Sequence, residues 1–399
     1  MSQLKRESGG STHSMPLFRI FGIEVRLDLS VVIIFALIVY SLGSGIFKVW
    51  HPDWSSMLVW STALTAGILF FVSLLAHELA HSVVAQHYGI PVPRITLFLF
   101  GGMAETSREP DSAKVEFLVA LAGPMMSLVI SIACSTLAVV NIEDGELLAR
   151  LGAGEAEALA TLGPMATALV WLGSINMILA IFNLIPGFPM DGGRVFRAFI
   201  WAVTGDHLMA TRWASNLGRL FGWSLMALGV MSLFGGHGFS GVWYILIGWF
   251  IANLAQLSYS QLVTEKALAG FRVVDLMEDR FETVDAGMPL TRFVDDCLLR
   301  SIQPVWPVAD AGQLVGFVSL PDVIDIPGEN RERILVREAM KRVADVPMLD
   351  ADTSAQAAID LLAGATSLPV PVMRAGQLVG FIQRGDIVRW LALHEFGRH

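Results

Sequence analysis

Residues 77–81 read H-E-L-A-H, with two histidines four positions apart and a glutamate directly after the first. On a helix, side chains four residues apart lie on the same face, so His77 and His81 can bind one zinc ion together. Glu78 then lies beside the attacking water and can act as its general base. The motif follows residues 57–76, which contain no charged side chain, and ionisable groups in such a run are costly and usually functional. We therefore interpret the motif as a hydrolytic zinc site in or beside a membrane, in preference to a chance pentapeptide on a buried helix.

A third ligand is expected from another apolar segment, which ends in N-L-I-P-G-F-P-M-D-G-G-R at residues 183–194. Its prolines and glycines should unwind the helix there. Irregular backbone at membrane depth is tolerated where it lines a cavity. Asp191 is then the carboxylate placed to complete a His, His, Asp site with one open position. The alternative, a helix-end or turn aspartate in an interfacial loop, would be preferred if the first motif were absent.

The elements that must position these residues are membrane helices. Of the 399 residues, 54% are hydrophobic and only 16% are charged, unlike a soluble domain of average composition. The sequence contains no stripe of basic residues that would suggest binding to nucleic acid. With only two cysteines, we expect neither a disulfide framework nor a cysteine metal site. A bilayer span needs about 20 mostly apolar residues. Six segments meet that requirement: 29–48, 57–86, 115–140, 163–185, 212–234 and 242–262.

Charge distribution predicts the orientation of these spans. Lysine and arginine occur before the first span, between the second and third, and between the fourth and fifth. The positive-inside rule makes these segments, and with them both termini, cytoplasmic in a multi-pass protein of the cell membrane. Residues 1–28 lack the apolar core and cleavage site of a signal peptide, so we expect a cytoplasmic lead-in. His77, His81 and Asp191 should then lie at the cytoplasmic ends of two inward-running spans.

Both motifs resemble those of the site-2 protease family of intramembrane zinc metalloproteases, and the resemblance covers most of residues 15–262. It implies an endopeptidase that cleaves a membrane-spanning protein and releases a soluble fragment. It also implies that Asn183 binds substrate or stabilises the tetrahedral intermediate. The residue roles implied by the resemblance are zinc ligation by His77, His81 and Asp191, and general base catalysis by Glu78.

Two further segments resemble the same family. F-G-G-M-A at residues 100–104 is similar to its re-entrant glycine segment, which is thought to present a strand edge to the unwound substrate. A-G-P at residues 122–124 matches its third-span signature, although Ser127 stands where an asparagine is common. The backbone N–H groups of Gly101 and Gly102, or Asn183, are candidates to bind the developing oxyanion.

Beyond residue 262 the sequence contains an internal repeat, because A-G-Q-L-V-G-F at residues 311–317 recurs at residues 375–381. Each copy predicts a lead-in, a helix, two strands joined by a glycine turn, and a closing helix. The two copies resemble a tandem pair of CBS domains, which pack as a pseudo-dimer and often bind adenine nucleotides. The expected boundaries are 263–272 for a linker, 273–328 for the first CBS domain and 336–392 for the second.

The CBS resemblance implies that Ser319 and Asp322 contact a nucleotide ribose. The second copy has the equivalent Asp386 but has Gln383 in place of the hydroxyl. Helix capping explains both aspartates equally well, since Asp is a favoured N-cap. A protein-docking or dimerising role, including a homodimer, is the alternative to binding ATP or another adenine nucleotide.

The sequence therefore predicts a polytopic α-helical membrane protein with six spans, a small re-entrant β segment and a cytoplasmic α/β CBS pair. Its expected function is zinc-dependent cleavage of a membrane protein near the cytoplasmic face, modulated by the CBS pair. The alternative is a CBS-gated divalent-ion transporter or channel that uses the same three ligands. That alternative gives Glu78 no role, and the membrane part lacks the internal repeat of many transporters.

Overall fold

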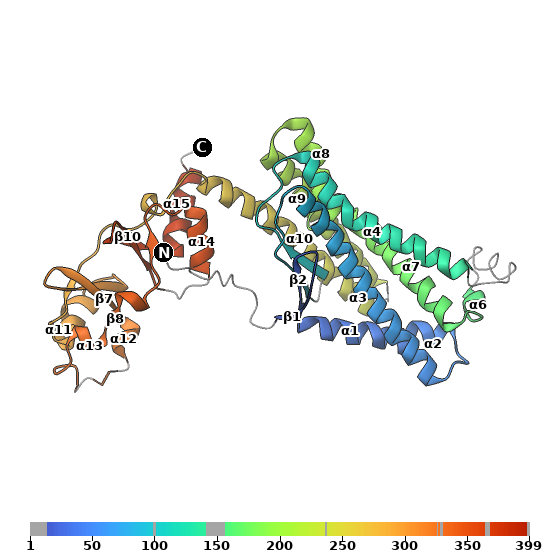
Figure 1. Ribbon diagram of the computed structural model, residues 1–399, viewed down its shortest axis with the longest axis horizontal. Helices are drawn as coiled ribbons and strands as arrows, with labels where there is room; N and C mark the ends of the chain where they lie inside the picture. The colour runs from blue at the N-terminus through green and yellow to red at the C-terminus, as the bar shows by residue number, and fades with distance from the viewer. Residues whose placement is uncertain are drawn as a thin grey trace. The chain divides into compact units, whose positions relative to one another are not determined.

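Figure 1 shows the computed structural model, which describes residues 14–98, 101–140, 156–235, 238–324, 326–327, 330–363 and 368–396. The chain divides into two compact units, Met1–Leu262 and Val263–His399. Within the described residues, six helical segments are long and apolar enough to cross a membrane, as predicted. They are Ser30–Trp50, Ser56–His87, Ala113–Val140, Pro164–Asn183, His207–Phe234 and Gly241–Leu268.

Helix α4 (Ala113–Val140) lies at the centre of the first unit. It packs against α3 (Ser56–His87), α7 (Pro164–Asn183) and α8 (Asp191–Thr204), and Figure 1 shows α3, α4 and α7 running alongside one another. Small residues at the contacts let membrane helices approach closely. The remaining helices of this unit are α1 (Ser30–Ser41), the π-helix Leu42–Ile46, α2 (Phe47–Trp50), α6 (Ala156–Leu159), α9 (His207–Phe234) and most of α10 (Gly238–Leu268).

A four-stranded sheet accompanies the helices of the first unit. Its order is β1 (Ser14–Ile20), β2 (Ile23–Asp28), β3 (Arg94–Phe98) and β4 (Gly101–Glu105), with only the β2–β3 pair parallel. Alternate residues of the two central strands are buried, as the period of a strand requires. Part of the predicted lead-in thus forms two strands. β4 carries the predicted glycine segment, whose residue 100 lies outside the described residues.

The second unit confirms the internal repeat. β6 (Val305–Asp310) pairs in parallel with β5 (Val284–Asp285) and antiparallel with β7 (Gln313–Ser319). β10 (Val370–Arg374) pairs in the same way with β9 (Leu349–Asp350) and β11 (Gln377–Ile382). Both hairpins turn through Ala-Gly with positive φ at each residue, 49° and 81° in the first and 51° and 81° in the second. Such φ values suit the two-residue turns that match strand twist.

The helices of the second unit are short and flank these strands. They are the 3-10 helices Val273–Asp275 and Val343–Asp345, α11 (Leu290–Phe293), the π-helix Val294–Leu298, α12 (Leu320–Ile324), α13 (Val336–Ala339), α14 (Ala355–Ala363) and α15 (Arg384–Phe396). β8 (Lys341–Arg342) adds antiparallel to β7.

The two copies exchange their lead-in segments. Val273 and Leu276, which precede the first copy, pack in the hydrophobic core of the second, while Val336 packs in the core of the first. The contiguous boundaries 273–328 and 336–392 therefore do not coincide with the two cores. Moreover, α10 continues to Leu268, so most of the expected linker 263–272 is helical.

Candidate metal centre

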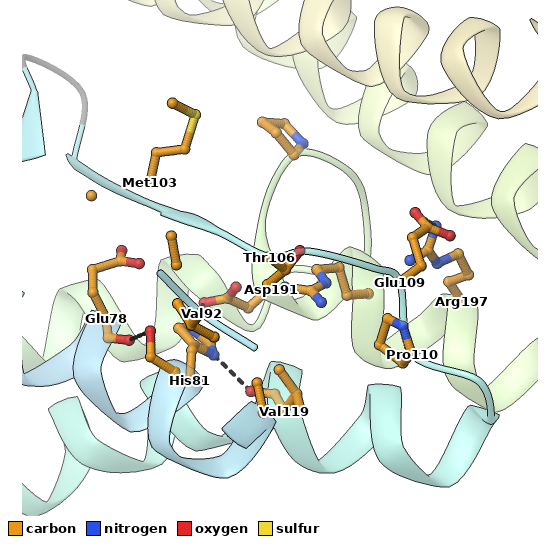
Figure 2. Close-up of a pocket in the computed structure, with 16 residues that line it drawn as sticks. Glu78, His81, Val92, Met103, Thr106, Glu109, Pro110, Val119, Asp191 and Arg197 are labelled. Atoms are coloured by element: carbon orange, nitrogen blue, oxygen red, sulfur yellow. Dashed lines mark hydrogen bonds and ion pairs between the residues drawn. The ribbon is translucent and has the colours of Figure 1, made fainter. Parts of the chain in front are cut away.

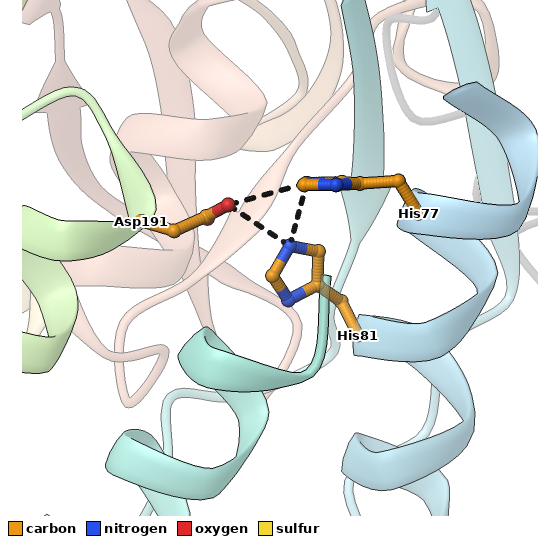
Figure 3. Close-up of side chains that lie close together, drawn as sticks. All are labelled: His77, His81 and Asp191. Carbon is orange, nitrogen blue, oxygen red and sulfur yellow. Dashed lines mark hydrogen bonds and ion pairs between the residues drawn. The ribbon is translucent and has the colours of Figure 1, made fainter. Parts of the chain in front are cut away.

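Three side chains from two helices meet at one point in the first unit. His77 Nε2 and His81 Nε2 each lie 3.2 Å from Asp191 Oδ2, and the two nitrogens lie 3.2 Å from each other (Figure 3). Ligand atoms placed 2.0–2.1 Å from a tetrahedral zinc ion are about 3.3 Å apart. The triangle therefore has the dimensions of one face of a zinc coordination tetrahedron, and these three atoms form the candidate metal cluster of the described residues.

The other ring nitrogen of each histidine is also engaged. His81 Nδ1 donates to the main-chain oxygen of Val119 at 2.6 Å, and His77 Nδ1 lies 2.8 Å from Ser127 Oγ. Because a carbonyl oxygen can only accept, Nδ1 of His81 carries the proton and Nε2 presents its lone pair to the centre. Hydrogen bonds of this kind fix the tautomer and orientation of metal-binding histidines. The donor set and its supports therefore fit a zinc ion.

Gly123 of α4 explains how three helices approach the centre so closely. A Cβ atom at this position would lie 2.1 Å from His81 Nε2 and 2.6 Å from His77 Nε2. No side chain larger than hydrogen fits there without displacing the imidazole rings. The A-G-P segment at residues 122–124 thus leaves open the space in which the three ligand atoms converge.

The segment between α7 and α8 brings Asp191 to the histidines. α7 ends at Asn183, the Phe188–Pro189 peptide bond is cis, and α8 begins at Asp191. This segment contacts α9 through its backbone, because a Cβ at Gly187 would lie 2.5 Å from the nitrogen of Gly218. The prolines and glycines that predicted a broken helix thus form a compact turn, and α8 starts at Asp191.

Comparisons with known proteins agree with this geometry. A model of peptidase family M50 matches residues 65–227, and a CBS domain model matches residues 336–393. The chain is 30% identical over 388 residues to a protein of Mycobacterium tuberculosis named zinc metalloprotease Rip3, covering 96% of this chain and 94% of that protein. The chain belongs to the M50 family, the site-2 protease family.

Two further similarities extend along the chain. Zinc metalloprotease sll0528 of Synechocystis sp. is 30% identical over 375 residues, covering 93% of this chain and 94% of that protein. A solved site-2 protease from Methanocaldococcus jannaschii is 26% identical, with a TM-score of 0.41, and the match covers 62% of this chain and 95% of that one. The expected family, enzyme class and membrane-helical fold with CBS domains are confirmed, and the chain is a multi-pass zinc metalloendopeptidase.

This M50 protease has a cavity of about 370 Å³ beside the metal centre (Figure 2). Glu78 borders it, and β4 passes directly over that side chain, since a Cβ at Gly102 would lie 2.3 Å from Glu78 Cγ. Glu78, the general base predicted from the sequence, thus follows His77 in α3 and lies against β4. Other lining residues include His81, Met103, Thr106, Glu109, Val119, Asp191, Arg194 and Arg197.

Asn183 is the one predicted catalytic residue that the structure does not bring to this cavity. It is the last residue of α7, is half-buried, and is not among the lining residues. Several other cavity residues are not predicted from the sequence to belong to the site. Arg194 and Arg197 lie on α8, and Glu109 precedes α4. Because these residues approach the metal centre only in the folded chain, no spacing in the sequence identifies them.

In the second unit, the predicted nucleotide residues make helix-capping contacts. Asp322 Oδ2 accepts from the backbone N–H and hydroxyl of Ser319 at 2.9 and 2.5 Å, and Asp386 Oδ2 accepts from the backbone N–H of Gln383 at 2.9 Å. In each case the aspartate is the third residue of a helix and accepts from the backbone N–H of the N-cap residue, Ser319 or Gln383. This contact is one half of a capping box. Each residue set also borders a cavity, of about 360 Å³ for Ser319 and Asp322 and about 680 Å³ for Asp386.

Proposed function

We propose that this protease hydrolyses a peptide bond of a membrane-spanning protein with one zinc ion held by His77, His81 and Asp191. The observation that carries the proposal is the 3.2 Å spacing of the three ligand atoms, combined with the Nδ1 contacts that turn both Nε2 atoms toward the centre. Three side chains that met by chance would not require hydrogen bonds at Nδ1 of both histidines. The open side of the triangle is available to water and substrate.

Glu78 acts as the general base. When bound, zinc polarises the scissile carbonyl and acidifies water, as it does in other zinc hydrolases. The Glu78 carboxylate, next in sequence to a ligand and bordering the cavity, accepts the proton of the attacking water and returns it to the leaving amine. Both transfers need the carboxylate within hydrogen-bond reach of the reacting atoms, which its place under β4 supports.

The edge of β4 receives the substrate. Within the described residues β4 pairs only with β3, so its other edge is open to an added strand. An unwound substrate segment paired there lies above Glu78, because Gly102 contacts that side chain. Backbone N–H groups of Gly101 and Gly102 are the preferred oxyanion donors. Asn183 is disfavoured for that role by its position outside the cavity lining.

Cleavage takes place near the cytoplasmic face and releases a soluble fragment into the cytoplasm, where both termini and the CBS pair also lie. Support comes from the lysine and arginine residues that flank the spans on the side where α3 ends and α8 begins.

Adenine nucleotides bind to the CBS pair and modulate cleavage. The cavity that contains Ser319 and Asp322 also contains Lys341, whose Nζ lies 3.2 Å from Asp322 Oδ1 and supplies a cation for phosphate. Equilibrium dialysis of the purified chain with ATP measures binding. Unchanged cleavage rates with and without saturating ATP would remove the regulatory part of this proposal, and a dimer seen by light scattering would favour a docking role.

The decisive test compares Glu78→Gln with the wild type in membranes that contain single-span candidate substrates. We expect the shortened product to fall by about 10²- to 10⁴-fold, the range for loss of a general base, with zinc content unchanged. Glu24→Gln, which neutralises a partly exposed carboxylate paired with Arg19, is the matched control. Cleavage by Glu78→Gln at the wild-type rate would exclude the mechanism, and zinc flux into liposomes by both proteins would favour the transporter.

A further inference from the structure

Two charged side chains lie buried beside the metal centre without belonging to it. Glu116, in the first turn of α4, is fully buried, and the side chain of Arg197 on α8 is only 8% exposed. Arg197 Nε donates to Glu116 Oε1 at 2.5 Å, and Arg197 Nη2 contacts the same oxygen. Burying two charges costs desolvation free energy that an apolar pair would avoid, so a pair like this one is weak evidence for stability. Its place in the fold points to another role.

α4 is the helix that holds both imidazole rings. Val119, three residues after Glu116, accepts the hydrogen bond of His81 Nδ1, and Ser127 further along the same helix contacts His77 Nδ1. His77 and His81 also share one helix, so their separation is set locally. The histidine half of the centre is therefore fixed relative to α4.

Asp191 has no such local constraint, because it begins a different helix. Arg197 lies on that helix, and its guanidinium carbon lies 5.2 Å from the ring centroid of Phe188, in the turn directly before Asp191. Arg197 thus contacts α4 through Glu116 and the ligand-bearing turn through Phe188. Figure 2 shows Arg197, Asp191 and Val119 around one cavity.

We propose that the Glu116–Arg197 ion pair positions the metal centre, by fixing α8 against α4 so that Asp191 meets the two histidines. This inference rests on the zinc ligands proposed above. Metal ligands must be held within about 0.5 Å of their working geometry. α8 also packs against α9, so altering the ion pair shifts the aspartate without removing the helix from the fold.

The test measures zinc affinity of the full-length protein in detergent, by competition with a chromophoric chelator, for Glu116→Gln and Arg197→Lys. We expect each substitution to weaken zinc binding by about 10- to 100-fold, the usual effect of losing a residue that supports metal ligands. The visible absorption of the Co²⁺-substituted protein should lose intensity as the tetrahedral geometry distorts. Ser131→Ala removes a buried hydrogen bond from α4 to Gly173 on α7 and is the matched control, with affinity equal to the wild type.

Asp191→Asn separates the two proposals. If this variant binds zinc as the wild type does, the proposed ligand set is wrong. If it loses zinc while Glu116→Gln and Arg197→Lys bind within twofold of the wild type, only the positioning role is wrong. Equal weakening in Ser131→Ala would also overturn that role, because any loosening of α4 would then suffice.

A double variant, Glu116→Leu with Arg197→Met, decides the question if the single variants fail to accumulate. It buries no charge, so its thermal midpoint should equal or exceed that of the wild type. Weakened zinc binding in this stable protein supports positioning by the ion pair. Wild-type affinity would show that packing alone places Asp191.

Discussion

Substituting Gly123 with alanine should disable the metal centre with one added methyl group. Its Cβ would lie 2.1 Å from His81 Nε2, whereas Cβ contacts below 3.0 Å essentially do not occur. The ring must therefore move by at least 0.9 Å. If α4 stays in place, that movement breaks the hydrogen bond from His81 Nδ1 to Val119. If α4 moves with the ring, the contact between Ser127 and His77 Nδ1 is displaced instead. Either response displaces a ligand by more than the roughly 0.5 Å that a metal site tolerates.

A misplacement of about 1 Å costs on the order of 10²-fold in rate, or about 2.7 kcal/mol at the transition state. We expect Gly123→Ala to lose at least that much activity. It should also retain less than one zinc per chain after gel filtration, as measured by inductively coupled plasma mass spectrometry. Gly67→Ala on α3 is the control, because its Cβ meets side-chain atoms of Val39 and Phe35 outside the centre. One zinc per chain and near-wild-type cleavage in Gly123→Ala would refute this reasoning.

Three other predictions concern a side chain that contacts His77, the zinc ion itself, and a buried histidine outside the metal centre. Ser127→Ala removes the partner of His77 Nδ1 and should weaken zinc binding by about 10- to 100-fold in a chelator competition. Zinc affinity equal to the wild type would show that the Ser127 hydroxyl does not support His77. Chelation of zinc should abolish cleavage without changing the far-ultraviolet circular dichroism, because the helices pack through their own apolar contacts, and added zinc should restore cleavage. Burial lowers the pKa of His51, so below about pH 6.5 the unfolded chain binds more protons than the folded chain. The stability of the protein should therefore fall as the pH drops from 7.5 to 5.5. Thermal unfolding should show a smaller fall in His51→Gln.

The clustering of His77, His81 and Asp191 could be predicted because it follows from residue types and their spacing. His77 and His81 are four residues apart, as on one face of a helix. The proline and glycine residues before Asp191 predict a helix break, which the structure has between Asn183 and Asp191. The six spans were predictable for the same reason, since apolar length is a local property. α7 and the predicted segment 163–185 differ by only one or two residues at their ends.

The contacts that support the ligands were not predictable, because they depend on which helices meet. Val119 contributes its main-chain oxygen, and no side-chain pattern identifies that role. Glu116 and Arg197 are 81 residues apart, and each alone is an ordinary charged residue on a helix. The exchange of lead-in segments between the CBS copies was missed for a similar reason, since a repeat shows which segments are equivalent and not which ones pack together.

The proposed positioning of the centre therefore depends on α4, which contributes none of the three proposed ligands. The histidine pair is aligned by its own helix, and the aspartate by a turn packed on α9, so without a common support the two halves would vary independently. α4 removes that freedom at three levels: Glu116 holds the aspartate helix, Val119 and Ser127 hold the rings, and Gly123 leaves space for the ligand atoms between them. It follows that substitutions at Glu116, Gly123 and Ser127 should impair metal binding more than stability, whereas substitutions at exposed positions of α4, such as Val129, should affect neither.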